Sequence, residues 1–385
     1  MKKRNNLISV FVILIALILY TTLALSFQKK NAPNSEANFS LTVHASIDSL
    51  IPYQQFTIEA SINYRNLQVF PITGKYGITD KKYVTLSEGL DKEYVIVNET
   101  SEVNELSMTN NSDHYIFIHS GDIVKGGKQD RTIQYDVIVP PREKDLPLAS
   151  FCVERGRWAG RGNEEVGLFK YSEYNVSSRD LKVSAKKLKS QTQVWDKVDK
   201  QKNKLAANMS VEYDTVFSFN NASNTSLQLA LEDSSLIELR ATYKSSFSSF
   251  LNRTDVIGMA YAINGEVYGI DIFNNDVFLR LKEKMIDGFI TEAVGDLDSS
   301  STLTLATTVD VKTLLFRPDQ TPDQAESNDV NSETKFDMMV YGKINRFVTT
   351  DKTIGQWLHL NILRESEETK IEQKNEEEIF FNNGR

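Results

Sequence analysis

The amino-acid sequence predicts an α+β fold, with mostly antiparallel β-sheet regions, a central helical segment and a β-hairpin. Three observations predict it. Segments with strand character fill the first half of the chain, helical patterns dominate the middle, and an Asn-Gly pair between two apolar segments follows them. Strands and helices therefore come in blocks instead of alternating along the chain, which is typical of the α+β class.

The strands of the first half are predicted from segments rich in β-branched and aromatic residues. Residues 131–139 alternate between apolar and polar side chains, which is the period of a strand with one buried face. Pro140 and Pro141 end that strand, because proline has no N–H to donate to a ladder. The other strands are expected at residues 67–72, 94–97, 115–119 and 148–154.

The helices of the middle part are predicted from apolar residues that recur at helical spacing. The clearest apolar stripe lies in residues 235–251, and we expect it to face the core. The other helices are expected at residues 178–189, 191–205 and 276–294.

A hairpin is predicted from residues 256–263 and 266–272. Asn264-Gly265 between them supplies the two positive φ angles that a type I′ turn requires. The polar segment 319–334 is expected to form a surface loop. Three further strands are expected near Phe336, Phe347 and Trp357.

The N-terminal residues 1–26 are predicted to be a signal peptide or a membrane anchor. A positively charged start, Met1–Arg4, precedes the apolar segment Leu7–Leu25. This segment has the pattern of a signal peptide and about the length of a membrane-spanning helix; a buried core helix is the alternative. A signal or an anchor predicts an extracytoplasmic protein, either secreted or held in the membrane by a single N-terminal transmembrane segment.

Composition divides the rest of the chain into three parts. Residues 27–38 form a polar linker, and residues 39–363 are predicted to be one α+β domain with up to two subregions. Residues 364–385 are an acidic tail, which we expect to be disordered because of its dense charge.

Composition also excludes several classes of function. The net charge of −8 argues against a nucleic-acid partner, since such proteins usually carry a basic excess. The single cysteine excludes a disulfide framework and a Cys-based zinc cluster. The four histidines show no metal-ligand spacing, so neither a metal nor a cofactor is predicted. The sequence leaves the oligomeric state open.

The densest polar cluster of the sequence spans residues 121–131. Its glycine pair, beside lysine and arginine, can expose backbone N–H groups to an anion; a tight turn with solvated charges is the alternative. A phosphate-binding P-loop is excluded, because Gln129 replaces the required Ser or Thr and a strand follows instead of a helix. The candidate ligand-binding residues here are Asp122, Lys128, Gln129, Asp130 and Arg131.

The second polar cluster is Cys152–Trp158. If the strands on either side of Pro140-Pro141 pair, Asp136 lies near Glu154, and these two carboxyl groups are candidates for acid/base catalysis. An ion pair with a neighbouring arginine is the alternative for Glu154. Cys152 has no histidine near it in the sequence to activate a nucleophile, so a small buried residue is its alternative. The cluster contributes three candidate ligand-binding residues, Cys152, Arg157 and Trp158.

The two clusters resemble the motifs of the ARG and rhodanese-phosphatase-superfamily-associated protein domain, a domain of unknown function. Its pattern Gly-acid-x-x-x-Gly-Gly/Ala-x-Gln-Asn/Asp-Arg is present at Gly121–Arg131, and Cys-Val-Glu-x-Gly-Arg-Trp is present at Cys152–Trp158. The segments Asn66–Pro71 and Tyr83–Leu90 match as well, and the resemblance spans about Tyr64–Leu363. It implies a link to nucleotide or ADP-ribose chemistry, but no established activity.

Three hypotheses of function follow. The first is a protein that binds a small polar or anionic ligand through the glycine-rich loop and the Cys-Val-Glu-Arg-Gly-Arg-Trp motif. The second is a hydrolase or transferase that acts on a nucleotide- or ADP-ribose-like substrate, with Glu154 as acid/base. The third is that both motifs form a buried polar network whose role is to stabilise the fold.

Overall fold

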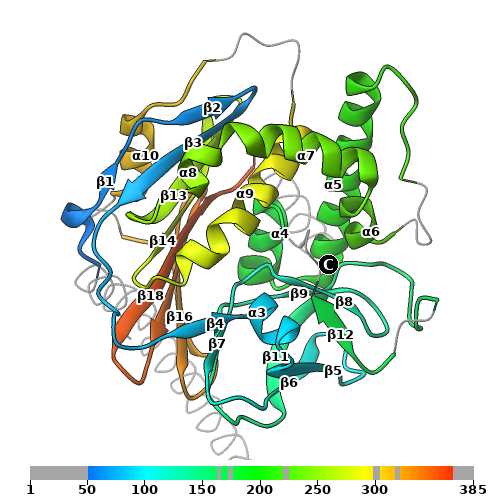
Figure 1. Cartoon of the computed structure of the whole chain (residues 1–385), viewed down its shortest axis with the longest axis vertical. Coiled ribbons are helices and arrows are strands. Elements are labelled where there is room, and N and C mark those ends of the chain that lie inside the picture. Colours follow the sequence, from blue (N-terminus) through cyan, green and yellow to red (C-terminus); the bar gives the residue numbers. More distant parts are fainter. Residues whose placement is uncertain are drawn as a thin grey trace, which may run out of the picture.

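Three β-sheets and a set of helices make up the described part of the protein. The structure is a computed structural model and describes residues 51–162, 166–171, 177–219, 225–297, 304–316 and 321–366. Figure 1 shows the largest sheet on one side and the smaller sheets on the other. The sheets are antiparallel apart from one parallel pair, β4 with β7, and this confirms the predicted α+β class.

The largest sheet has nine strands in the order β1-β3-β13-β14-β18-β17-β16-β15, with β2 paired to β3. It joins the start of the described chain to its end, because the β13–β14 hairpin lies between β3 and β18. The strands are β1 (Thr57–Ile58), β2 (Ile62–Tyr64), β3 (Leu67–Thr73), β13 (Val256–Ile263), β14 (Glu266–Phe273), β15 (Gln324–Asp329), β16 (Thr334–Tyr341), β17 (Ile344–Asp351) and β18 (Gln356–Arg364).

Two smaller sheets are built from the segment between β3 and the helices. The first has the order β10-β7-β4 and the second the order β12-β8-β9-β11-β6-β5. Their strands are β4 (Tyr83–Thr85), β5 (Val95–Glu99), β6 (Glu105–Asn110), β7 (Tyr115–Ile118), β8 (Ile123–Gly126), β9 (Arg131–Ile133), β10 (Val137–Val139), β11 (Leu146–Cys152) and β12 (Phe169–Tyr171).

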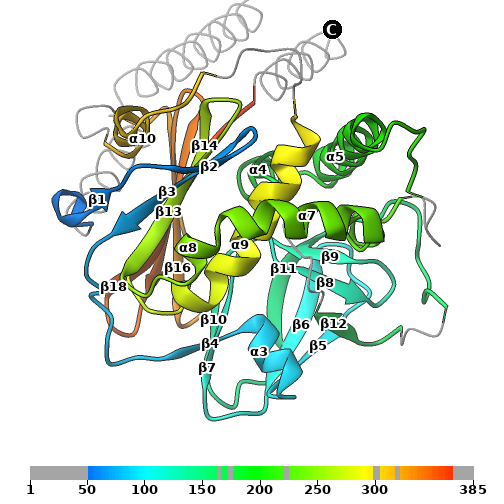
Figure 2. The same cartoon turned by 45° about the horizontal axis from the view of Figure 1, so that its top comes forward.

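The helices cover both faces of the largest sheet. Figure 2 shows α7 and α9 between this sheet and the smaller ones, and α10 on the opposite side. The helices are η1 (Tyr53–Gln55), α3 (Leu86–Asp91), α4 (Arg179–Val183), the π-helical turn η2 (Ser184–Leu188), α5 (Gln191–Glu212), α6 (Leu227–Leu231), α7 (Ser234–Ser246), α8 (Ser248–Leu251), α9 (Phe278–Gly295) and α10 (Thr308–Leu315).

Strand alternation divides the apolar core at the largest sheet. On β13, Met259 and Tyr261 pack into the core that contains α5, α7 and α9, whereas Ala260 and Ala262 pack into the core under α10. The turn after β13 is the predicted one, because Asn264 and Gly265 have φ angles of 52° and 79°.

Two predicted elements differ in the structure. The strand predicted at residues 131–139 is split, because residues 134–136 leave the ladder and β10 joins a different sheet from β9. The loop predicted at residues 319–334 contains strand β15, which pairs with β16 over six residues. β15 is polar and half-buried at the edge of the sheet, so it lacks the apolar pattern from which strands are predicted.

The predicted localisation is corrected by the structure. Within the described ranges, no helix has both the length and the apolar character needed to cross a bilayer. The two helices of at least 18 residues, α5 and α9, carry charged side chains along their length. This finding overturns the prediction of an extracytoplasmic protein, secreted or held by an N-terminal transmembrane segment. The predicted signal or anchor, the linker and residues 367–385 of the predicted tail lie outside the described residues.

Candidate functional site

The two sequence clusters meet around the carboxylate of Asp130, which has no solvent exposure. Its oxygens accept hydrogen bonds from Arg161 at 3.1 and 3.2 Å, from Ser226 Oγ at 3.0 Å and from Arg157 Nη2 at 3.4 Å. The backbone N–H of Gly126 donates to the same carboxylate at 3.0 Å. The glycine loop therefore does bind an anion, but that anion is a side chain of the same protein.

Glu154 lies in the same network and is also fully buried. Its Oε2 accepts a hydrogen bond of 2.6 Å from Arg157 Nε, and its Oε1 lies 3.7 Å from Arg161 Nη1. Gln129 Nε2 donates to the backbone carbonyl of Glu154 at 2.7 Å. Both carboxylates are thus held between two arginines, and we call this set of Gln129, Asp130, Glu154, Arg157 and Arg161 the motif network.

Arg131 and Cys152 lie opposite each other in the β9–β11 ladder. Arg131 is fully buried and donates to the carbonyl of Val103 at 2.9 Å, to Cys152 Sγ and to Glu99. Burial raises the pKa of the Cys152 thiol to about 11 despite the nearby arginine. The thiol is therefore protonated at neutral pH, which does not suit a nucleophile.

Trp158 is exposed, and the half-buried Lys128 lies beside it. The indole of Trp158 is 45 % exposed. The ammonium of Lys128 lies 5.0 Å from the centre of that ring and donates to Ser101 Oγ at 2.9 Å. These contacts form a cation–π pair at the edge of the motif network.

Asp122 and Asp136 belong to a different buried cluster, between the largest sheet and the β10-β7-β4 sheet. Asp122 pairs with Lys284 of α9. Asp136 accepts hydrogen bonds of 2.7 Å from the Ser120 N–H, from Thr349 Oγ1 and from His359 Nδ1. Among the described residues, Asp136 and Glu154 bind different partners, so the structure does not join these two as an acid/base pair.

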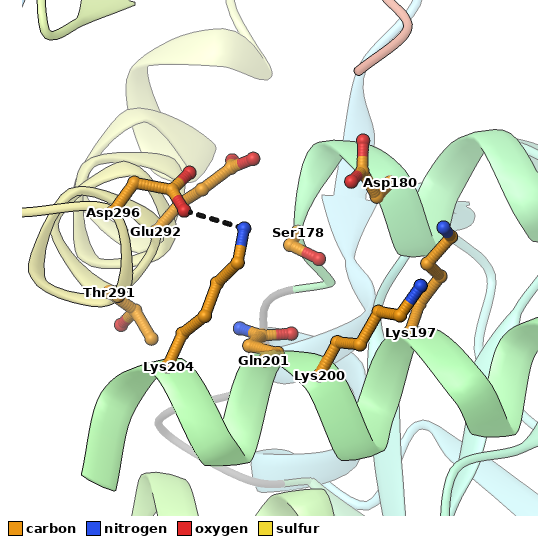
Figure 3. A pocket seen from close by; sticks show the side chains of 10 residues that line it. Ser178, Asp180, Lys197, Lys200, Gln201, Lys204, Thr291, Glu292 and Asp296 are labelled. Atoms are coloured by element: carbon orange, nitrogen blue, oxygen red, sulfur yellow. Dashed lines mark hydrogen bonds and ion pairs between the residues drawn. The ribbon is translucent and has the colours of Figure 1, made fainter. Parts of the chain in front are cut away.

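A cavity that the sequence analysis did not identify lies between α4, α5 and α9 (Figure 3). Its volume is about 40 Å³, enough for a few water molecules or one small oxyanion. Figure 3 shows side chains rising from α5 toward α4 and α9 across this space. The lining residues are Ser178, Asp180, Lys197, Lys200, Gln201, Lys204, Thr291, Glu292, Gly295 and Asp296.

Lysines dominate the α5 side of this cavity. Lys197, Lys200 and Lys204 are spaced i, i+3, i+7, which places them on one face of the helix. Lys204 Nζ lies 2.9 Å from Asp296 Oδ1, and Lys200 Nζ lies 3.2 Å from Asp196 of its own helix. We call this cavity with its lysine-bearing wall the α5 pocket.

Glu292 forms part of the opposite wall of the α5 pocket. Burial raises the pKa of its carboxyl to about 7, although Arg179 opposes that shift and Asp296 and Asp180 add to it. Tyr261 Oη donates to Glu292 Oε2 at 3.1 Å, and Arg179 Nε lies 3.8 Å from Oε1. A carboxyl group that titrates near neutral pH beside a cavity is a frequent sign of a functional site.

The sequence gives one signal that would have found the α5 pocket, namely the lysine spacing on the predicted helix. That spacing alone also fits a solvated helix face, because charged residues occupy such faces in most proteins. The partners on the far wall come from residues 178–180 and 291–296, and only the folded chain shows that they lie opposite.

The chain matches the model of a known protein family. A family model described as the ARG and Rhodanese-Phosphatase-superfamily-associated Protein domain matches residues 55–363. This match confirms the resemblance found from the two motifs. Neither the search of curated proteins nor the search of solved structures returned a match.

Proposed function

Because the chain belongs to the ARG and Rhodanese-Phosphatase-superfamily-associated Protein domain family, whose function is not established, we propose a function from its own side chains. The protein binds a small anionic ligand, and the α5 pocket holds it. The observation that carries this proposal is the wall of three lysines facing a cavity of oxyanion size.

The lysine wall concentrates positive charge on one side of the cavity. Like charges at i, i+3 and i+4 positions destabilise a helix by about 0.2–0.5 kcal/mol for each pair. Lys197 lies buried at 3 % exposure, so its charge is poorly screened by water. An oxyanion between these ammonium groups would offset their repulsion and accept charge-assisted hydrogen bonds.

The acidic residues of the α5 pocket support this assignment in different ways. Asp296 lies 2.9 Å from Lys204 and holds its ammonium at the cavity. Glu292 loses its negative charge as the pH falls below about 7, because burial raises the pKa of its carboxyl. The pocket is therefore most favourable to an anion on the acid side of neutrality.

The motif network supports the hypothesis that the two family motifs stabilise the fold. Hydrogen bonds join Arg157 to Asp130 and to Glu154, and they join Asp130 to the glycine loop. The carboxylate of Glu154 faces Arg157 and Arg161, an ion-pair arrangement instead of the setting of an acid/base catalyst. We therefore assign the ligand to the α5 pocket, and to the motifs the role of holding the β8–β9 loop against β11.

Removing a pocket lysine should weaken anion binding. We expect Lys200→Ala and Lys204→Ala each to lower the affinity for sulfate about tenfold, since a hydrogen bond from a charged donor contributes about 1.5–3 kcal/mol. Isothermal titration calorimetry with sulfate measures this, because sulfate keeps a constant charge between pH 5 and 8. Wild-type affinity should also fall as the pH rises through about 7, as Glu292 ionises.

A matched control removes one lysine elsewhere. Lys82 is exposed and makes one ion pair with Asp276, so Lys82→Ala changes the net charge equally without touching the pocket. Its sulfate affinity should equal that of the wild type. If the wild type does not bind sulfate or phosphate, or if Lys82→Ala weakens binding as much as the pocket variants do, the α5 pocket is not an anion site.

A further inference from the structure

The buried cluster around His359 contains a second arrangement of ligating side chains, independent of the α5 pocket. His119 follows β7, while Asp271 and His359 lie on the neighbouring strands β14 and β18. Their exposures are 3 %, 1 % and 1 %, and one ligand atom from each lies within 4.8 Å of the other two. We infer that these three side chains form a binding site for a divalent transition-metal ion of the zinc class.

The orphaned nitrogen of His119 is the observation that points to a ligand. His119 Nε2 is buried and has no hydrogen-bond partner among the described residues. Buried polar atoms in native proteins almost always have a partner, so such an atom calls for an explanation. A metal ion between the three side chains would supply the partner, because an imidazole nitrogen is a preferred ligand of zinc.

The second contact of His359 is the one that zinc-binding histidines usually make. His359 Nδ1 donates to Asp136 Oδ2 at 2.7 Å, which leaves Nε2 as the atom that faces Asp271. Asp136 is held in turn by the Ser120 N–H and by Thr349 Oγ1. This carboxylate–histidine arrangement fixes the ring and raises the basicity of the ligating nitrogen.

Asp271 is oriented by a neighbour as well. Asn361 Nδ2 donates to Asp271 Oδ1 at 2.8 Å, and the same oxygen lies 3.1 Å from His359 Nε2. Coordination by one ion would replace the contact between Asp271 and His359. A tetrahedral ion with bonds of about 2.0–2.1 Å places its ligand atoms about 3.4 Å apart. His119 Nε2 makes no hydrogen bond to a described residue, so His119 is the ligand that would move toward the other two when the ion binds.

The cluster holds two carboxylates that favour a cation. Asp271 is one of the three ligands, and Asp136 binds the other nitrogen of His359. Lys182 and Lys284 bring positive charge near His119. Lys284 is paired with Asp122, and Lys186 Nζ is held by Asn361 Oδ1 at 2.5 Å and Ser120 Oγ at 3.3 Å. Two imidazoles and one carboxylate favour zinc over calcium or magnesium, which prefer oxygen ligands alone. Three protein ligands leave one position of a tetrahedral ion for water or another donor.

Metal binding by the full chain tests this inference. After treatment with a chelator and its removal, the wild type should bind one Zn²⁺ per chain. His119→Gln and His359→Gln should each bind it at least about 100-fold more weakly, and Asp136→Asn about 10- to 100-fold more weakly. His114→Gln is the matched control, because His114 stacks on Tyr94 away from the cluster, and its affinity should equal that of the wild type.

The wild type alone decides the matter where a variant fails to fold. Zinc-edge X-ray absorption of the wild-type complex should show two imidazole ligands and oxygen donors. The inference is overturned if the wild type binds no stoichiometric Zn²⁺, if the bound ion lacks imidazole ligands, or if folded His119→Gln and His359→Gln bind as tightly as His114→Gln. Neither sulfate binding nor its loss bears on this result, because the α5 pocket and the His119 cluster share no residue.

Discussion

Replacing Asp130 by alanine should lower the free energy of unfolding by about 3 kcal/mol or more. The carboxylate is fully buried and lies between Arg157, Arg161 and Ser226. Removing one partner from a buried ion network leaves the other charges without compensation, which costs about 3–5 kcal/mol. The Gly126 N–H also loses its acceptor, so the β8–β9 loop should open.

The matched control for this prediction is an aspartate–arginine pair on the surface. Asp113 and Arg142 form two hydrogen bonds of 2.8 Å, but their side chains are 78 % and 62 % exposed. Asp113→Ala should therefore leave the free energy of unfolding close to that of the wild type, because water and salt screen an exposed ion pair. Urea unfolding followed by circular dichroism measures both variants. If Asp130→Ala is instead folded and as stable as the wild type but no longer binds sulfate, the family motifs and not the α5 pocket form the ligand site.

The parts of the fold that the sequence predicts are those governed by local chemistry. The β13–β14 hairpin is one example, because Asn264 and Gly265 adopt the two positive φ angles that their residue types allow. The pairing of β9 with β11, which the sequence analysis assumed as a condition, is present in the structure, but only over three residues of each strand. The hairpin turn is determined by residues within a few positions of one another, whereas the pairing of the two strands is not.

The break after β9 shows where local prediction ends. Asp136 sits in an alternating segment that predicts a continuous strand, yet its carboxylate is bound by Thr349 and His359, 213 and 223 residues further along the chain. Those contacts draw residues 134–136 out of the ladder and send β10 into another sheet. The alternation of apolar and polar residues in this segment cannot predict contacts with residues so distant in the sequence.

Distance along the sequence also determines which parts of the candidate sites can be predicted. The polar character of the glycine loop predicts an anion, and the structure supplies Asp130 from within the same cluster. The histidines at 119 and 359 have no ligand spacing along the chain, because strands β7 and β18 bring them together only in the folded protein. Sequence motifs therefore identify residues that interact with one another. Whether those residues bind a side chain of the same protein or an external ligand depends on the folded structure.

Glu292 should make the stability of the protein fall as the pH rises from about 4.5 to about 7. Burial raises the pKa of its carboxyl to about 7 in the folded state, whereas the ordinary value of 4.5 applies when the chain unfolds. Between these values the folded state binds more protons than the unfolded state, so the contribution is complete below about 4.5 and is lost as the pH rises through 7. With 1.36 kcal/mol for each unit, the loss is about 3 kcal/mol.

Glu292→Gln isolates this contribution, because glutamine keeps the shape of the side chain and its acceptor oxygen for Tyr261 but carries no charge. The stability of the variant relative to the wild type should rise by about 3 kcal/mol between pH 4.5 and pH 8 in urea unfolding. Glu283→Gln on the same helix is the control: Glu283 is 65 % exposed and pairs with Lys244, so the change should cost less than about 1 kcal/mol. A difference for Glu292→Gln that does not change with pH would mean that this carboxyl is ionised throughout. The α5 pocket would then present a full negative charge to any anion at neutral pH, and its lysines would have to overcome that charge as well as their own repulsion.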